Sequence, residues 1–297
     1  MTDNLRGALL MIGAMAFFTF NDAFMKSLSD ELPLFQAIFL RGVATSLFIT
    51  ALAWGLGQLR FRFGRADWGL VSLRTASEVA AAYFFVTALF NAPIANVTAI
   101  LQALPLTVTL AGAVFLGEPI GWRRMSAILV GFVGVLLIVK PGAAGFNIYS
   151  LYAVATVVVV TARDLAVRRM SASVPSLSVA TIGAYGVTAF AGLASLGEHW
   201  VLPSAQAMGQ LGGAVAFILG AYVFSVMTMR QGDIGAVTPF RYTSLVFALV
   251  IGWLVFGEWP DTMTLLGSAI VVATGIFTLL RERTMGRKTA LPAVRLR

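Results

Sequence analysis

Two stretches of this sequence repeat one another, and their spacing constrains the fold more than any other feature. The first runs from Ala92 to Glu118, and the second runs from Gly232 to Glu258, 140 residues later. Aligned without a gap, the copies share Ile94, Val97, Thr98, Gly112, Gly117 and Glu118, which fall on Ile234, Val237, Thr238, Gly252, Gly257 and Glu258. Each copy is a long apolar run that ends in a Gly-Glu pair. A period near half the chain length predicts two similar halves.

The apolar runs are long enough to cross a membrane. Charged residues make up 11% of the chain and hydrophobic residues 59%, whereas soluble domains carry roughly 25% charged residues. A membrane-spanning helix needs about 20 mostly apolar residues. We count ten such segments, which cover 5–28, 33–57, 67–90, 92–118, 121–139, 147–168, 176–196, 205–230, 232–258 and 261–280. The sequence therefore predicts an all-α integral membrane fold with ten transmembrane helices.

The repeat divides these helices into two sets of five. We expect residues 1–142 to form the first repeat, residues 143–281 the second, and residues 282–297 a basic cytoplasmic tail. Basic residues in short loops mark the cytoplasmic side, and the arginines cluster in loops on one side if the N-terminus is cytoplasmic. An odd number of helices in each half then requires that the second repeat is inverted relative to the first. The prediction is an N-in, C-in topology.

Several function classes are excluded by residue content. The chain has no cysteine and a single histidine, His199, so a metal cluster is not expected. None of its three lysines stands in a P-loop context, so we expect neither a nucleotide site nor another cofactor. The net charge of +8 comes from basic residues at the ends of apolar runs, a pattern of membrane topology rather than of nucleic-acid binding. The loops are too short for an active site, and we do not expect an enzyme.

Charged side chains inside the apolar segments are candidates for function. A charge at the centre of a membrane helix costs about 2.5–3.5 kcal/mol on the insertion scale, so such residues are rarely accidental. The candidates for gating or proton coupling are Asp22, Arg41, Glu78, Arg163 and Asp164. One interpretation is structural pairing of Arg41 with Glu78 or Asp22, and of Arg163 with Asp164. The other is that at least one of them lines a water-filled path.

Glu78 is the best candidate for a proton site, because it lies 11 residues into the third predicted helix. A desolvated carboxyl at mid-membrane can exchange protons near neutral pH. The alternative is a carboxylate paired permanently with Arg41 or Arg74.

Polar and aromatic residues on four helices predict where a solute binds. Thr98 and Gln102 share a face of the fourth helix, and Pro105 frees a backbone carbonyl near Leu101 and kinks that helix. The predicted substrate-binding residues are Tyr83, Thr98, Gln102, Tyr222, Arg241 and Tyr242. The glycines of the fifth and tenth helices are assigned to close helix packing.

The duplicated five-helix unit and the two Gly-Glu motifs, Gly117-Glu118-Pro119 and Gly257-Glu258, resemble the EamA-type ten-helix branch of the drug/metabolite transporter superfamily. The resemblance covers the chain from Asn4 to about Leu280, and the second half departs from the pattern at Trp259. It implies a carrier of the bacterial inner membrane with inverted halves and a central cavity. Similar proteins export amino acids or drugs, or import vitamins and S-adenosylmethionine, and the N-terminal stretch also resembles alphaproteobacterial members that include riboflavin importers.

We therefore expect a secondary active transporter that moves a small organic metabolite by alternating access. The alternatives are an exporter of drugs or amino acids with the same fold, or a membrane scaffold without transport. The expected partners are the solute and the lipid bilayer, with no nucleic acid, and a homodimer is one option for the assembly.

Overall fold

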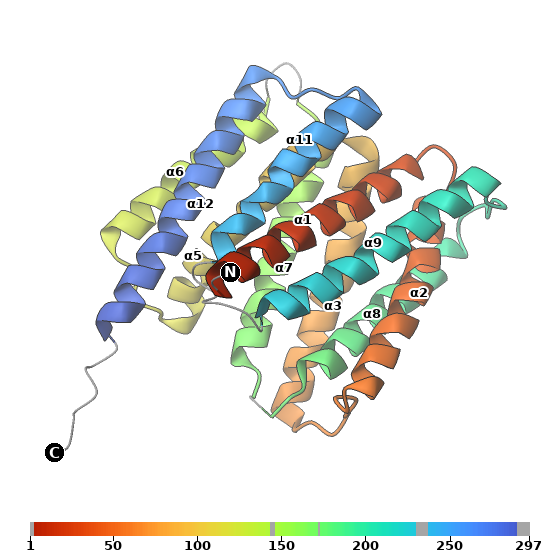
Figure 1. Ribbon diagram of the computed structural model, residues 1–297, viewed down its shortest axis with the longest axis horizontal. Helices are drawn as coiled ribbons and strands as arrows, with labels where there is room; N and C mark the ends of the chain where they lie inside the picture. Colours follow the sequence, from red (N-terminus) through yellow and green to blue (C-terminus); the bar gives the residue numbers. More distant parts are fainter. Residues whose placement is uncertain (1–2, 143–145, 172, 230–236, 290–297) are drawn as a thin grey trace.

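The computed structural model describes residues 3–142, 146–171, 173–229 and 237–289, and within these ranges the chain is helical and forms no strand (Figure 1). The elements in chain order are α1 (Asp3–Ser27), α2 (Leu34–Gly55), α3 (Arg65–Asn91), α4 (Ile94–Leu101), α5 (Leu104–Leu116), α6 (Trp122–Val139), α7 (Tyr149–Arg169), α8 (Ser176–Ser195), α9 (Ala205–Met229), η1 (Thr238–Tyr242), α11 (Thr243–Phe256) and α12 (Thr262–Thr289). Ten segments of the described chain are long and apolar enough to span a membrane, which confirms the predicted ten-span fold. The eighth helix is predicted to end at Arg230 and the ninth to begin at Gly232, and both positions lie outside the described residues. Ile234 of the second repeat copy also lies outside them.

Prolines and left-handed residues set the ends of many helices. Pro33, Pro93 and Pro175 directly precede the first residues of α2, α4 and α8, where proline disfavours helix in the residue before it. Gly117 and Gly257 follow α5 and α11 with φ of 70° and 65°, a region that glycine reaches without strain. The Gly-Glu pairs of the two repeat copies therefore end helices, as the sequence indicates.

The fourth and ninth predicted helices are interrupted rather than continuous. The first copy of the motif divides into α4 and α5 at Gln102 and Ala103, since Pro105 has no N–H to donate to the carbonyl of Leu101. The second copy begins with the 3₁₀ turn η1, which contains Pro239, and continues as α11. The prediction of a proline kink in the fourth helix is confirmed, and the same interruption in the ninth brings Arg241 onto a 3₁₀ turn.

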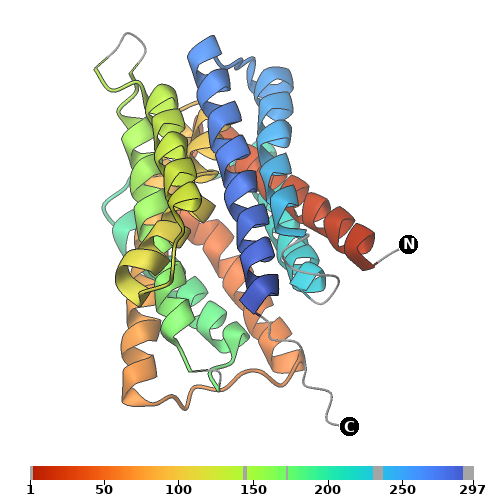
Figure 2. The same cartoon turned by 90° about the vertical axis from the view of Figure 1, so that its left-hand side faces the viewer.

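The most extensive helix contacts join α1 to α9, α2 to α8, α3 to α7 and α6 to α12. Each pair takes one helix from residues 1–142 and one from the rest of the chain, and Figure 2 shows α6 and α12 side by side along their lengths. Between α1 and α9, a phenylalanine ring of one helix covers a glycine of the other, as Phe17 does over Gly220 and Phe24 over Gly213. The two halves are thus packed into one bundle.

Glycines allow α6 and α12 to approach closely. A Cβ at Gly134 would lie 2.8 Å from the carbonyl oxygen of Gly267, so neither position accommodates a side chain, and the assignment of these glycines to packing is confirmed. At one end of this pair, Lys140 forms an ion pair with Asp261. The hydrogen bond from Lys140 lowers the pKa of Asp261, and backbone N–H groups at the start of α12 add to the effect.

Candidate functional site

Asp22 on α1 and Arg41 on α2 are joined through an amide. Oδ1 of Asn21 accepts a hydrogen bond from Nη1 of Arg41 at 3.3 Å, and Nδ2 of Asn21 donates to Oδ1 of Asp22 at 2.9 Å. The side chain of Asn21 is buried, and the charges of Asp22 and Arg41 act on one another. Of the two partners considered for Arg41, the structure therefore places Asp22 beside it.

Glu78 pairs with Arg74, one turn earlier on α3, with 2.7 Å between Oε2 and Nη1. The same Nη1 donates to the carbonyl oxygen of Val179 on α8 at 3.1 Å. Oε2 of Glu78 contacts the position that a Cβ of Gly183 would occupy, also on α8. The pair consequently joins α3 to α8, and the alternative pairing of Glu78 with Arg41 is wrong.

The fit between this pair and Gly183 gives a testable prediction. In Gly183→Ala the new Cβ would lie 2.8 Å from Nη1 of Arg74 and in contact with Glu78, so the pair must shift. Overpacking of this kind costs about 1–3 kcal/mol, and we expect a lower thermal midpoint for the purified protein in detergent. The control is Gly212→Ala, where nothing lies within 4 Å of the added Cβ. Equal midpoints for the two variants would contradict the contact.

Arg163 and Asp164 are neighbours on α7 and form the third charged group. Nε and Nη2 of Arg163 donate to the same carboxylate oxygen, Oδ1 of Asp164, at 3.0 and 2.9 Å. Arg241 on η1 lies within electrostatic range of both. The expected pairing of Arg163 with Asp164 is confirmed.

Tyr222 on α9 lies where these groups converge. Four charged side chains from α2, α3 and α7 interact electrostatically with its hydroxyl: Arg41, Arg74, Glu78 and Arg163. The ring is partly buried and meets Phe18 of α1 edge-on, with 6.2 Å between centroids. We call the following residues the interior polar cluster: Asp22, Arg41, Arg74, Glu78, Arg163, Asp164, Tyr222 and Arg241.

Three other predicted binding residues lie at the two interrupted helices. Nε2 of Gln102 donates to Oγ of Ser244 on α11 at 2.6 Å, and its side chain is buried. Thr98 is partly buried one turn earlier on α4. Tyr242 is buried with its hydroxyl against Gly275 of α12. In this conformation Gln102 and Tyr242 contact protein rather than open space.

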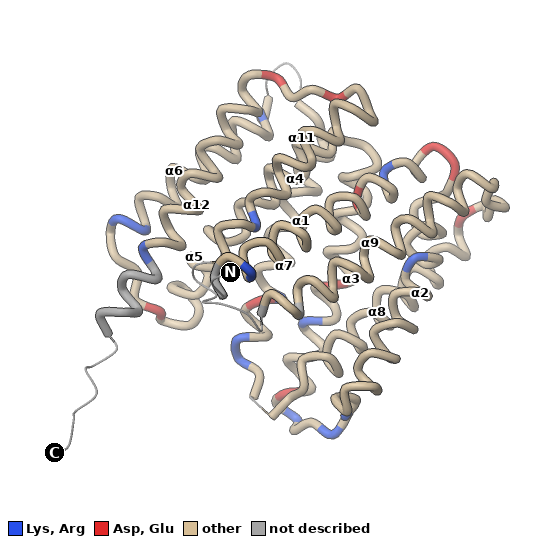
Figure 3. Tube along the Cα trace, viewed as in Figure 1, with Lys and Arg blue, Asp and Glu red and all other residues tan. Residues whose placement is uncertain are grey.

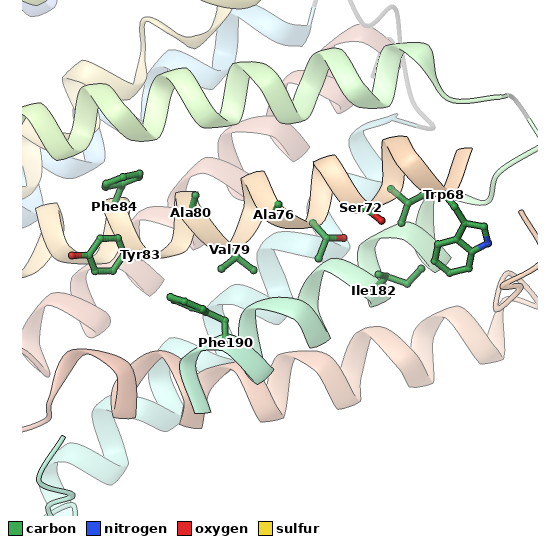
Figure 4. Close-up of a pocket in the computed structure, with 11 residues that line it drawn as sticks. Trp68, Ser72, Ala76, Val79, Ala80, Tyr83, Phe84, Ile182 and Phe190 are labelled. Atoms are coloured by element: carbon green, nitrogen blue, oxygen red, sulfur yellow. The ribbon is translucent and has the colours of Figure 1, made fainter. Parts of the chain in front are cut away.

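Tyr83 lies in different surroundings from Tyr222. It lines an apolar pocket of about 670 Å³ between α3 and α8, together with Trp68, Phe84 and Phe190 (Figure 4). Its ring stacks on Phe35 of α2, with centroids 5.8 Å apart. Tyr222 is not among the residues that line this pocket. Tyr83 and Tyr222 therefore do not line the same pocket in this conformation, and the prediction that both bind the solute stays a prediction.

Besides the pair of Lys140 with Asp261, two further ion pairs join the halves that the sequence analysis does not predict. Nζ of Lys26 lies 3.1 Å from Oε1 of Glu258, and it donates to the carbonyl oxygen of Ala92 at 2.6 Å. The backbone N–H of Ile94, at the start of α4, donates to Oε2 of Glu258 at 3.1 Å. A pair of the same kind joins Arg168 to Glu118, with 2.9 Å between Nη1 and Oε1.

The two pairs lie at opposite ends of the bundle. Lys26 contacts the carbonyl oxygen of Leu89 near the last residue of α3. Arg168 lies near the end of α7, where the N–H of Ser171 donates to Asp67 in the first turn of α3. The Lys26 and Glu258 side chains are 9% and 24% exposed, but those of Arg168 and Glu118 are 39% and 46% exposed. The pair at the Lys26 end is therefore more deeply buried than the pair at the Arg168 end.

The sequence does contain a signal for these pairs. Both acids belong to the repeated Gly-Glu motif, and Lys26 aligns with Arg169, next to Arg168, in the second half. The motif was interpreted only as a helix end, because a linear sequence does not show that each carboxylate reaches the opposite half. As for metals, no group of three acidic or histidine side chains is placed to hold one among the residues that the structure describes.

Comparison with known proteins identifies a matching protein family and several relatives. The sequence model of the EamA-like transporter family matches residues 5–140 and 147–280. An S-adenosylmethionine uptake transporter of Rickettsia conorii is 27% identical over 274 residues, covering 90% of each chain. A pseudopaline exporter of Pseudomonas aeruginosa is 30% identical over 280 residues, covering 91% of this chain and 94% of the other.

Two further matches extend this comparison. A riboflavin transporter of Vibrio cholerae is 29% identical over 201 residues, covering 67% of each chain. A solved crystal structure superposes with a TM-score of 0.65 at 20% identity, covering 94% of this chain and 98% of the other.

Proposed function

This chain belongs to the EamA-like transporter family, and we propose that it carries its solute by alternating access around the interior polar cluster. It is a multi-pass protein of the bacterial inner membrane that transports a small metabolite. The observation that supports alternating access is that two ion pairs between the halves, Lys26 with Glu258 and Arg168 with Glu118, lie at opposite ends of the bundle and are unequally exposed. A carrier of this kind is closed at one end at a time.

In the proposed cycle, the conformation described here is closed at Lys26 and Glu258. Opening that end requires the buried pair to separate and the carbonyl oxygens of Leu89 and Ala92 to lose their shared donor. At the other end, Glu118 and Arg168 are already partly in contact with water, so their separation costs less. Closing the Arg168 end while the Lys26 end opens would move the cluster from one compartment to the other.

We also propose that residues 1–142 and 143–281 are inverted repeats. The contacts support this relation, because a two-fold axis between the halves exchanges the α1–α9 pair with the α3–α7 pair. The same axis exchanges α2 with α8 and α6 with α12, so each of these two pairs is mapped onto itself. The two matches of the family sequence model, one to each half, agree with it.

The proposed orientation places the Arg168 end in the cytoplasm. Figure 3 shows Lys and Arg gathered toward the lower ends of α2, α3 and α6, and Asp and Glu at the loops after α1 and α11. Since basic loops remain in the cytoplasm, the lower end in this view is cytoplasmic and the Lys26 end is periplasmic.

Transport by the purified protein tests the proposal. Proteoliposomes would be assayed for uptake and counterflow of radiolabelled S-adenosylmethionine, riboflavin and the common amino acids, with and without a pH gradient. We expect saturable counterflow of at least one solute, and accumulation above equilibrium under a gradient if transport is ion-coupled. Absence of counterflow for every solute, with correctly inserted protein, would favour the scaffold alternative, and the direction of net flux would separate import from export.

A further inference from the structure

The interior of the membrane-spanning bundle carries one uncompensated positive charge. Seven charged residues of the described chain lie three or more residues inside both ends of their spans: Asp22, Arg41, Arg74, Glu78, Arg163, Asp164 and Arg241. Four are arginines and three are acids. Each acid has an arginine beside it, Asp22 through Asn21 and the other two directly. Arg241 is the arginine that remains.

The surroundings of Arg241 do not compensate this charge. Its guanidinium forms no hydrogen bond or ion pair with any residue that the structure describes. Among the described residues, the acid that acts on Arg241 is Asp164, whose Oδ1 already accepts two hydrogen bonds from Arg163. Arg163 also acts on Arg241 as a like charge. Asp164 is thus shared between two arginines and neutralises only one.

Arg241 is also accessible, although it lies within the bundle. Its side chain is exposed to solvent, yet protein atoms surround it and remove most of its hydration. Phe240, the preceding residue on η1, is 38% exposed. A guanidinium that is accessible although protein atoms surround it is within reach of a solute that enters the bundle, and Arg241 stands on the 3₁₀ turn η1 of the ninth span.

A cation without a partner in such a place is stabilised by an anion that comes into contact with it. The planar guanidinium offers two parallel N–H donors that match the two oxygens of a carboxylate. A carboxylate carries one negative charge, which balances the single excess charge of the interior, whereas a phosphate monoester carries about 1.5 to 2 at neutral pH. We propose that the transported solute has a carboxylate, and that Arg241 binds it. This inference rests on the proposed transport function and names the chemical class of its solute.

Matched pairs of solutes test the proposal. The free L-amino acids and S-adenosylmethionine would each be compared with the corresponding carboxamide or methyl ester, alongside riboflavin and ethanolamine phosphate. The two measurements are the thermal midpoint of the detergent-solubilised protein and inhibition of counterflow. We expect at least one free acid to bind. Its amide or ester, in which the carboxyl group is uncharged, should bind about tenfold to a hundredfold more weakly, as the loss of a charge-assisted hydrogen bond implies. Riboflavin, which has no carboxylate, should not compete.

Variants assign the effect to one residue. Arg241→Gln should weaken binding of the free acid by about the same factor and leave binding of its amide or ester unchanged. Arg241→Lys should retain part of the preference for the free acid. The matched control is Arg281→Gln at the end of the tenth span, where the preference should be that of the wild type. An unchanged preference in Arg241→Gln would overturn the proposal.

Other outcomes separate this proposal from the transport function. Binding and counterflow of riboflavin alone, equal in wild type and Arg241→Gln, would leave the transporter function standing and refute the carboxylate. A stronger, Arg241-dependent effect of ethanolamine phosphate, which has no carboxylate, would refute it in favour of a phosphate group. Binding of no solute in the set would overturn the carboxylate proposal, and counterflow of none would count against the transport function itself.

Discussion

Lys26→Met is expected to lower transport by more than tenfold and to destabilise the protein. The change leaves the carboxylate of Glu258 with only the Ile94 N–H as a donor, and it removes the donor shared by two backbone carbonyls. Removing one partner of a buried pair typically costs about 3–5 kcal/mol. The measurements are counterflow in proteoliposomes and the free energy of unfolding in detergent.

Two further variants separate gating from stability. Arg168→Met removes the cation of the exposed pair, where the loss should be no more than about 1 kcal/mol. Lys26→Met with Glu258→Leu replaces the whole buried pair with apolar groups, which is often neutral for stability, so we expect a stable protein that transports poorly because it no longer opens and closes normally. Full transport by this double variant would show that the pair is not a gate.

Glu78→Gln is expected to reduce the amount of folded protein in the membrane and to abolish accumulation driven by a pH gradient. The change removes the negative charge that neutralises Arg74 and leaves it with neutral acceptors such as the carbonyl oxygen of Val179, and an unpaired interior charge costs about 3–5 kcal/mol. A proton that reaches Glu78 must break the same ion pair. We therefore propose that proton coupling, if Glu78 provides it, acts by releasing Arg74 and with it the contact between α3 and α8.

The double variant Arg74→Met, Glu78→Gln tests both parts. Restored membrane levels would establish the structural pairing, and Arg41→Met with Glu78→Gln is the matched control that should not restore them. In the restored protein we expect downhill counterflow without gradient-driven accumulation. If Glu78→Gln is present at wild-type levels and still accumulates solute under the gradient, neither role of Glu78 is correct.

Much of the fold could be predicted because apolar segment length and the repeated motif are local properties of the chain. Such patterns predict the ten spans, the proline break at Pro105 and the packing glycines of the fifth and tenth spans, which are α6 and α12. The pairing of Glu78 with Arg74 could also be predicted from the sequence, since Arg74 lies one helical turn away. These features depend on residues that are close in sequence.

The site was harder to predict because it depends on which helices face each other. Tyr83 and Tyr222 occupy related places in the two halves, yet the first contacts α2 and the pocket beside α8 while the second lies within range of four charges. Glu118 and Glu258 were interpreted as ends of helices, although each pairs with a base 50 or more residues away. Arg241 stands out as the interior arginine without a partner among the described residues only once the other described interior charges are paired.

Side-specific labelling tests the central claim of alternating access most directly. The chain has no cysteine, so Phe240→Cys provides a single thiol beside Arg241, which a membrane-impermeant maleimide can reach only through an open end. With Lys26 and Glu258 intact, we expect labelling from the cytoplasmic side and little from the periplasmic side. Adding Glu258→Gln should raise periplasmic labelling several-fold. Periplasmic labelling that is already high in the parent and does not change with Glu258→Gln would contradict the account.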